Sequence, residues 1–188
     1  MKNNEEKKIS EYIELKSQVK IYYFEDEIYG TILKESSKFI LIRDIKDWHY
    51  DGYMIFPKKY ISKIQYKKIE KFREKVMDKT VANTDNIKWL NLNTYDTLFF
   101  SLVENYNKIC IEGASKNVNQ FIIGKISEYS KKSLAINKLD IYAKLSSEKI
   151  EVPIKDITCI YFKDEYSSKL FEYNEALGLN SGISRYRI

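Results

Sequence analysis

The chain contains few of the residues that interrupt or cross-link a polypeptide. Its 188 residues include only two prolines and six glycines, which excludes collagen-like and proline-rich architectures. Its two cysteines, Cys110 and Cys159, lie in the apolar stretches KICIE and ITCIY, without a Cys-x-x-Cys spacing. We therefore predict two buried thiols in a reducing compartment, with neither a disulfide bond nor a metal site.

Long apolar runs and histidine are also scarce. No apolar run approaches the roughly 18 residues that a membrane-spanning helix needs, and the polar start MKNNEEKKIS lacks the apolar core of a signal peptide. These features predict a soluble, cytoplasmic protein that does not contact membranes. With a single histidine and no glycine-rich phosphate loop, the sequence assembles no catalytic set, so we expect no enzyme and no cofactor.

The charge balance is only mildly basic, and aromatic residues are abundant. There are 32 Lys and Arg against 27 Asp and Glu, a formal net charge of +5. A dedicated nucleic-acid-binding domain usually carries a larger excess or a clear basic stripe. The 16 Tyr and 9 Phe favour pleated, half-buried strands.

Two stretches of the chain are nearly repeated. Aligning Gly30 with Gly124 matches IYGTILKESSKFILIRDI to FIIGKISEYSKKSLAINKLD, and a small change of offset matches PKKYISKIQY to PIKDITCIYF. The second match places the only two prolines, Pro57 and Pro153, at equivalent positions. Chance similarity between apolar strands does not easily align both prolines. We interpret the pattern as an internal duplication. The matched segments are 28–45 with 121–140 and 57–66 with 153–162.

Each copy is predicted to form short antiparallel strands. In the first copy, Ile28, Gly30 and Ile32 alternate with polar and aromatic residues, the pattern of a half-buried strand. A glycine inside a strand favours a bulge or a sharp bend. The predicted strands are 18–25, 28–35, 39–45 and 53–57, followed by a helical turn and a closing strand within 60–66, with a loop at 46–52.

Amphipathic helices are predicted before and after each set of strands, and Thr94 is the expected N-cap of the helix before the second set. The helices after the strands carry the apolar stripes Ile69, Phe72, Val76 and Tyr166, Leu170, Tyr173, Leu177, and Gly178 ends the second of them. The predicted organisation is a first unit at 1–77, a linker at 78–93, a second unit at 94–177 and a tail at 178–188.

A helix ahead of five bent strands, with a glycine in the second strand and Ile-x-x-Ile near the end, resembles the Sm-like (SH3-like barrel) fold. The resemblance covers about residues 8–66 and 96–162. It implies a mainly β (α+β) protein of two tandem five-stranded barrels, each flanked by short helices. The RNA-contacting motifs of the family are not matched by KESSKFIL and FPKKYISKI, or by SEYSKKSLAI and VPIKDITCI in the second copy.

The segment DWHYD is a candidate for chemistry. If it is extended, Asp47, His49 and Asp51 project to one side, where a carboxylate beside the imidazole could tune a general base. The alternative is a strand-connecting loop with a surface histidine. The corresponding segment of the second copy, DIYAKLSSEKIE, has no counterpart, so the loop is favoured and no catalytic residue is predicted.

Residues 58–75 form a basic segment with interleaved tyrosines. Such cations could follow a nucleic-acid backbone while the aromatic rings stack on bases. The alternative is a solvated face, because Glu70 and Glu74 dilute the helical part and lysines also protect sheet edges. The candidate nucleic-acid-binding residues are Lys58, Lys59, Lys63, Lys67, Lys68, Tyr60 and Tyr66.

A small barrel cannot bury all of its aromatic residues, and exposed tyrosines mark interaction surfaces. A seam between the two barrels is the alternative explanation. The sequence favours a non-catalytic binding module that mediates protein–protein interaction, with an RNA- or DNA-binding protein as the alternative. We expect a protein partner and a monomer or homodimer. The candidate protein-interaction residues are Tyr22, Tyr29, Trp48, Tyr50 and Tyr53.

Overall fold

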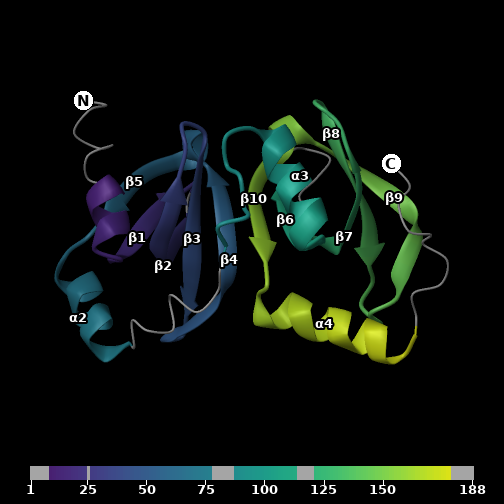
Figure 1. The fold of residues 1–188 in the computed structure, drawn as a ribbon. Helices are drawn as coiled ribbons and strands as arrows, with labels where there is room; N and C mark the ends of the chain where they lie inside the picture. The colour runs from purple at the N-terminus through teal and green to yellow at the C-terminus, as the bar shows by residue number, and fades with distance from the viewer. Residues whose placement is uncertain (1–8, 25, 78–86, 114–120, 179–188) are drawn as a thin grey trace. The chain divides into compact units, whose positions relative to one another are not determined.

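The structure, a computed structural model, describes residues 9–24, 26–77, 87–113 and 121–178. The chain divides into two units, residues 1–98 and 99–188, and the division falls inside helix α3. Both units are mainly β, with antiparallel strands and short helices (Figure 1). Each unit is considered separately below.

In the first unit, a short helix at residues 9–14 precedes five strands and a final helix. The strands pair in the order β5-β1-β2-β3-β4. Because β1 pairs with both β2 and β5, the last strand returns to the first. The elements are β1 (Gln18–Tyr23), β2 (Asp26–Glu35), β3 (Phe39–Lys46), β4 (His49–Pro57), the 3-10 turn η1 (Lys58–Tyr60), β5 (Ile61–Gln65) and α2 (Lys68–Val76).

The second unit repeats this arrangement. Its strands pair in the order β10-β6-β7-β8-β9, so its first strand, β6, again pairs with the second and the last. The elements are α3 (Tyr95–Asn105), β6 (Lys108–Gly113), β7 (Phe121–Tyr129), β8 (Ser133–Leu139), β9 (Leu145–Pro153), the 3-10 turn η3 (Ile154–Asp156), β10 (Ile157–Phe162) and α4 (Glu165–Ala176).

The two glycines of the repeat occupy equivalent places. Gly30 lies in β2 opposite Val19 and Asp44, and Gly124 lies in β7 opposite Ile109 and Lys138. A Cβ on Gly30 would lie 2.7 Å from the backbone oxygen of the next strand, and one on Gly124 would lie 2.3 Å from it. Neither position has room for a side chain, because the neighbouring strand crosses too closely.

The turns of the two units also correspond bond for bond. Ser36 Oγ accepts hydrogen bonds from two backbone amides of its own turn, and Ser130 Oγ does the same in the second unit. Pro57 ends β4 just before η1, and Pro153 ends β9 just before η3. The duplication read from the sequence is therefore a repeat of the structure.

The predicted loop at 46–52 is wrong. β4 begins at His49, and Lys46 pairs directly with His49. Only Asp47 and Trp48 form the turn, and both have positive φ, 43° and 68°. Two successive positive φ angles are the geometry of a tight two-residue hairpin. This turn could not be predicted from the residues present, because neither Asp47 nor Trp48 is a glycine, the residue that usually signals such a turn.

The helix before the second set of strands agrees with its prediction. Leu98 and Leu102 are buried, and the Thr94 hydroxyl accepts a hydrogen bond from the Thr97 amide at 3.1 Å. The part of the predicted linker that is described is not a solvated connector, because Leu90 and Leu92 are buried in it. Residues 78–86 and 179–188 lie outside the described part of the chain.

In the helices that follow the strands, most of the predicted apolar stripe faces outward, although in α4 Leu170 packs against the core that contains Phe171. In α2, Ile69, Phe72 and Val76 are 46%, 54% and 58% exposed, whereas Glu70 is completely buried. In α4, the stripe residues Tyr166, Tyr173 and Leu177 are exposed, whereas Ser167, Phe171 and Asn174 are buried. The stripes are present as predicted, but their exposed members do not face the core.

Candidate interaction surfaces

Helix α2 is held to β1 by Glu74. The Glu74 carboxylate accepts a hydrogen bond from the Gln18 backbone amide in β1 and one from the Tyr66 hydroxyl, both at 2.8 Å. Glu70 is buried, and its carboxylate accepts a hydrogen bond at 2.6 Å from the amide of Lys67, the N-cap residue of the same helix. With Glu70 buried and Glu74 bound to β1, the apolar side of α2 faces outward.

The outward side of α2 combines apolar and positive side chains. Ile69, Phe72 and Val76 are flanked along the helix by three exposed lysines. A hollow beside the helix is lined by residues 65–69 and Lys71. We call this surface the α2 face; it consists of Ile69, Phe72, Val76, Lys68, Lys71 and Lys75, together with Trp48.

Trp48 belongs to the α2 face because its indole lies against the helix. Its ring meets the Phe72 ring edge-on, and the Arg73 guanidinium carbon lies 5.0 Å from its centroid. The side chain is still 48% exposed. A left-handed backbone costs a residue with a side chain about 1–2 kcal/mol. Backbone strain that holds a large ring at the surface is typical of functional sites.

The candidate nucleic-acid residues have different local contacts. Three of them, Tyr66, Lys67 and Lys68, line the hollow beside α2, and Tyr66 also donates to Glu74. Lys58 makes an ion pair with Glu35 at 2.7 Å. The Lys59 ammonium lies over the Tyr60 ring, and the Lys63 ammonium lies over the Tyr22 ring.

The candidate protein-interaction residues differ in their exposure. Tyr22 and Tyr29 are half-buried, and the Lys20 ammonium lies 5.5 Å and 5.1 Å from their ring centroids. The hydrogen bond from Lys20 to Glu27 raises the pKa of that lysine above its ordinary value. Trp48 is the one of this set that the structure places on the α2 face.

The remaining two candidate residues, Tyr50 and Tyr53, lie in β4. The sequence pattern does not predict how deeply they are buried. Tyr50 is half-buried and accepts a hydrogen bond from the Gln18 amide side chain at 3.3 Å. Tyr53 is only 2% exposed, and the Arg43 guanidinium carbon lies 4.6 Å from its ring centroid. Its predicted place on an exposed surface is wrong. From Asp51 to Pro57 every residue of β4 is buried, so the strand has no solvent side.

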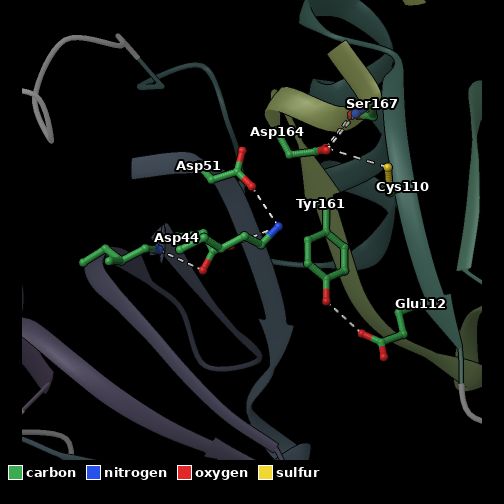
Figure 2. A network of polar contacts seen from close by, with 9 residues as sticks. Asp44, Asp51, Cys110, Glu112, Tyr161, Asp164 and Ser167 are labelled. Atoms are coloured by element: carbon green, nitrogen blue, oxygen red, sulfur yellow. Dashed lines mark hydrogen bonds and ion pairs between the residues drawn. The ribbon is translucent and has the colours of Figure 1, made fainter. Parts of the chain in front are cut away.

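Asp51 of the DWHYD segment and Asp44 of β3 lie beside one lysine (Figure 2). Asp51 accepts a hydrogen bond from the Lys46 ammonium at 2.8 Å, and Asp44 lies 3.8 Å from the same nitrogen. The turn at Asp47 and Trp48 interrupts the extended run, so the condition under which Asp47, His49 and Asp51 would project to one side is not met. His49 itself is exposed at the start of β4.

A polar cluster of the second unit, also drawn in Figure 2, fixes the start of α4. Asp164 caps the helix by accepting hydrogen bonds from the Ser167 amide at 2.9 Å and from the Ser167 hydroxyl. The Cys110 thiol donates to the same carboxylate at 3.8 Å. Cys110 and Cys159 are both buried thiols, as predicted. Nearby in the same unit, Tyr161 donates to Glu112 at 2.9 Å.

The loop between β8 and β9 presents two large apolar side chains. Ile141 is 85% exposed and Tyr142 is 76% exposed. The loop is fixed from within, because Asp140 Oδ1 accepts hydrogen bonds from the backbone amides of Tyr142 and Lys144 at 2.9 Å and 2.8 Å. It is also fixed to α4, because the Asn174 side chain donates to the Ala143 oxygen at 2.7 Å.

The exposed side of α4 carries further apolar side chains together with acids that are mostly paired with lysines. Lys169 makes an ion pair with Glu165 one turn away. Glu175 is 2.7 Å from the Lys108 ammonium and 3.7 Å from that of Lys125, and the hydrogen bond from Lys108 lowers the pKa of Glu175. We call this surface the α4 face; it consists of Ile141, Tyr142, Tyr166, Tyr173 and Leu177, with Glu165, Glu172 and Glu175.

The α2 and α4 faces are equivalent features of the repeat. Each combines the helix after the last strand with the tip of the hairpin between the third and fourth strands of its unit. The sequence of the second copy contains no counterpart of DWHYD. The residues that mark this surface in the sequence are Ile141 and Tyr142, a pair of large apolar residues inside a loop, which the repeat pattern did not predict.

No family model, curated protein or solved structure matches this chain. Within the described ranges, no helix is long and apolar enough to span a membrane, and no group of three or more His, Cys, Asp and Glu side chains is arranged to hold a metal ion.

Proposed function

We propose that the protein is a non-catalytic binding module that acts by protein–protein interaction, with the α2 face as a docking surface. One observation carries this proposal. Helix α2 turns Glu70 and Glu74 toward its own unit and exposes Ile69, Phe72 and Val76. Contiguous exposed apolar side chains rimmed by polar groups are typical of interaction sites.

The chemistry of the α2 face selects a class of partner. Trp48 and Phe72 are aromatic anchors of the kind that dominate interface energetics. The rim is positive, because Lys68, Lys71 and Lys75 are exposed while both acids of α2 are engaged with their own unit. The complementary partner is a protein surface that presents apolar side chains among Asp and Glu.

Nucleic acid is the second candidate, and the pairing of cations with aromatic rings favours it. The Lys63 ammonium lies 5.1 Å from the Tyr22 ring centroid, and the Arg73 guanidinium carbon lies 3.7 Å from that of Tyr29. Arrangements of this kind bind single strands by charge and stacking. However, these rings already carry a cation, which a stacking base would have to displace.

We also infer that each unit is an Sm-like barrel and serves as the scaffold for its face. Several features support this inference: a helix ahead of the strands, a glycine where two strands cross closely, a 3-10 turn before the closing strand, and a first strand that pairs with the last. A short bent sheet of this kind places the following helix against the sheet end. The cytoplasmic location stays a prediction.

Photo-crosslinking from the α2 face tests the protein–protein proposal. A photoreactive phenylalanine analogue replaces Phe72 in the full chain, and the chain is irradiated in native cytosol with and without nuclease. The matched control carries the analogue at Phe100, which is 58% exposed on α3. We expect a nuclease-resistant protein adduct from position 72 that is absent from position 100. The yield of this adduct should fall when the substitutions Lys71→Glu and Lys75→Glu are added to the chain.

The opposite results would overturn the proposal. Equal adducts from both positions would show that the α2 face has no preference for a partner. Adducts that consist of nucleic acid, together with oligonucleotide binding that falls steeply with salt, would favour the second candidate. Loss of that binding on Lys63→Ala would assign it to the strand surface.

A further inference from the structure

The Arg73 side chain packs against two aromatic rings of the first unit. Its guanidinium carbon lies 3.7 Å from the centroid of the Tyr29 ring, in β2, and 5.0 Å from that of Trp48, at the tip of the β3–β4 hairpin. Arginine packs on ring faces because its planar, delocalised cation is weakly hydrated, and such packing does not engage the N–H donors at the edge of the plane. The two rings therefore hold the cation in place without using its donors.

No acid of the described chain pairs with this cation. Arg73 Nε is buried without a hydrogen-bond partner, and among the described residues no carboxylate forms an ion pair with the guanidinium. The acids of the same helix are engaged elsewhere, since Glu70 accepts from the Lys67 amide and Glu74 from the Gln18 amide. The second oxygen of Glu70 is also buried without a partner, so it does not satisfy the guanidinium. A half-buried cation without a partner is costly, and a carboxylate from outside the chain would remove that cost.

Exposed apolar rings lie directly beside Arg73. Trp48 and Phe72 are both exposed, and their rings meet edge-on. The exposed charges of α2 are three lysines, Lys68, Lys71 and Lys75, so this helix favours an anion. An anion that reaches Arg73 therefore lies next to rings that an apolar side chain can cover.

From this arrangement we propose that Arg73 is the specificity-determining residue of the α2 face and binds the side-chain carboxylate of an Asp or Glu in the protein partner. The proposal rests on the proposed function, since it names the group that the partner presents. A carboxylate accepts two parallel N–H···O bonds from a guanidinium, which fixes both the position and the direction of the acid. A phosphate accepts the same bonds, but the rings of Trp48 and Phe72 favour a protein segment, in which acidic and apolar side chains are neighbours.

Peptide selection supplies the probe for a test. Random peptides displayed on phage are selected on the full chain, and peptides that also bind the Phe72→Ser variant are discarded. We expect the remaining peptides to carry an Asp or Glu close to a large apolar residue. One of them is then synthesised with blocked ends, once in its acidic form and once with the acid replaced by the matching amide, so that only the side-chain carboxylate differs.

The affinity of both peptides is measured for the native chain and for variants of Arg73. Replacing the acid by the amide should weaken binding to the native chain by about ten-fold or more, but should have little effect on binding to Arg73→Gln. The matched control, Lys71→Gln, removes an exposed charge from the same helix and should weaken binding of the acidic peptide by about five-fold or less. Arg73→Lys keeps the charge but loses the planar pair of donors, so it should weaken binding more than Lys71→Gln does.

Nuclear magnetic resonance of the arginine side chains reports the contact directly. The Nε–H resonance of Arg73 is assigned by its loss in Arg73→Lys. It should shift when the acidic peptide is added to the native chain and stay in place with the amide form. Circular dichroism and thermal unfolding of each variant serve as the folding control. The comparison of the two peptides on the native chain does not depend on any variant.

Equal binding of the acidic and amide peptides to the native chain would overturn the proposal, as would native-like binding of the acidic peptide by Arg73→Gln. In both cases the protein–protein function stands, because the peptides were selected for their dependence on Phe72. If no selected peptide depends on Phe72, the proposed function fails together with this inference. If a single-stranded oligonucleotide shifts the Arg73 resonance and the acidic peptide does not, the anion is a phosphate and the second candidate function is favoured instead.

Discussion

The indole of Trp48 meets the ring of Phe72 edge-on, with ring centroids 6.1 Å apart and the ring planes at 86°. This contact joins the tip of the β3–β4 hairpin to helix α2. It also offers an explanation for the left-handed backbone conformation of Trp48. A φ of 68° is unfavourable for any residue with a side chain. The hairpin adopts this unfavourable conformation although its largest side chain, that of Trp48, lies on the surface.

The strain at Trp48 can be separated from its contacts. Trp48→Ala and Trp48→Gly both remove the ring, but only glycine relaxes the left-handed backbone. We expect Trp48→Gly to be more stable than Trp48→Ala by about 1 kcal/mol. Both variants should lose association through the α2 face. Urea unfolding measures the difference in stability, and equal stabilities of the two variants would contradict the assignment of strain.

The neighbouring strand passes close to Gly30 and to Gly124, but at different distances. We therefore predict that alanine substitutions at the two positions destabilise the fold to different degrees. Gly124→Ala would place a Cβ 2.3 Å from a backbone oxygen, and Gly30→Ala would place one at 2.7 Å. We expect each substitution to destabilise its unit by about 1–3 kcal/mol, with Gly124→Ala the more damaging.

Gly178 provides the matched control for the repeat glycines. Its φ is +63° and no atom lies within 4 Å of an added Cβ, so Gly178→Ala should cost only the backbone strain of about 1–2 kcal/mol. Urea unfolding of Gly30→Ala, Gly124→Ala and Gly178→Ala ranks the three variants by their loss of stability. A Gly124→Ala variant as stable as the native chain would contradict the crossing geometry.

The apolar loop of the second unit depends on a buried amide. Asn174→Ala removes the hydrogen bond to the Ala143 oxygen and leaves that oxygen without this donor, at a cost of about 1–3 kcal/mol. Amide hydrogen exchange should become faster at 140–144 while the strands of the first unit stay protected. Asp140→Ala is the comparison, because it loosens the same loop without altering α4. Unchanged exchange in both variants would show that the loop is held by other contacts.

Because Glu175 and Lys108 form an ion pair, we predict that the stability of the fold decreases at acidic pH. The pKa of Glu175 is lowered in the folded chain, so the pair stabilises the fold above the ordinary carboxyl pKa of about 4.3, and this stability is lost as the pH falls through the folded value. Because Glu175 is 41% exposed, we expect less than about 1 kcal/mol. The stability difference between native chain and Lys108→Met should be present near neutral pH and vanish in acid. A constant difference would exclude Glu175 as its source.

Buried tyrosines predict a loss of stability in alkali. Burial raises the pKa of Tyr95 to about 12 and raises that of Tyr161 further. A raised pKa means that the neutral ring stabilises the fold below the ordinary value of about 10, and that this stability is lost as the pH rises toward the folded value. Ultraviolet titration should show tyrosine side chains that ionise only at a pH well above the ordinary tyrosine pKa, or only when the protein unfolds. Tyr95→Phe should remove one of them, and a titration unchanged by it would contradict the prediction.

The sequence by itself determined the repeat, the strands and the elements that follow from local chemistry. Gly30 and Gly124, Pro57 and Pro153 mark the same places in both copies because a close strand crossing excludes a side chain and a strand end tolerates proline. Thr94 and Gly178 mark helix ends because capping depends on neighbours along the chain.

Only the tertiary structure decided which side of a helix or strand is exposed. The stripe of α2 predicts an apolar side, but the burial of Glu70 and the hydrogen bond from the Gln18 amide of β1 to Glu74 leave that side facing outward. Tyr53 is buried because β4 has no solvent side. Such outcomes depend on hydrogen bonds and packing between segments far apart in sequence, which periodicity along one segment cannot report.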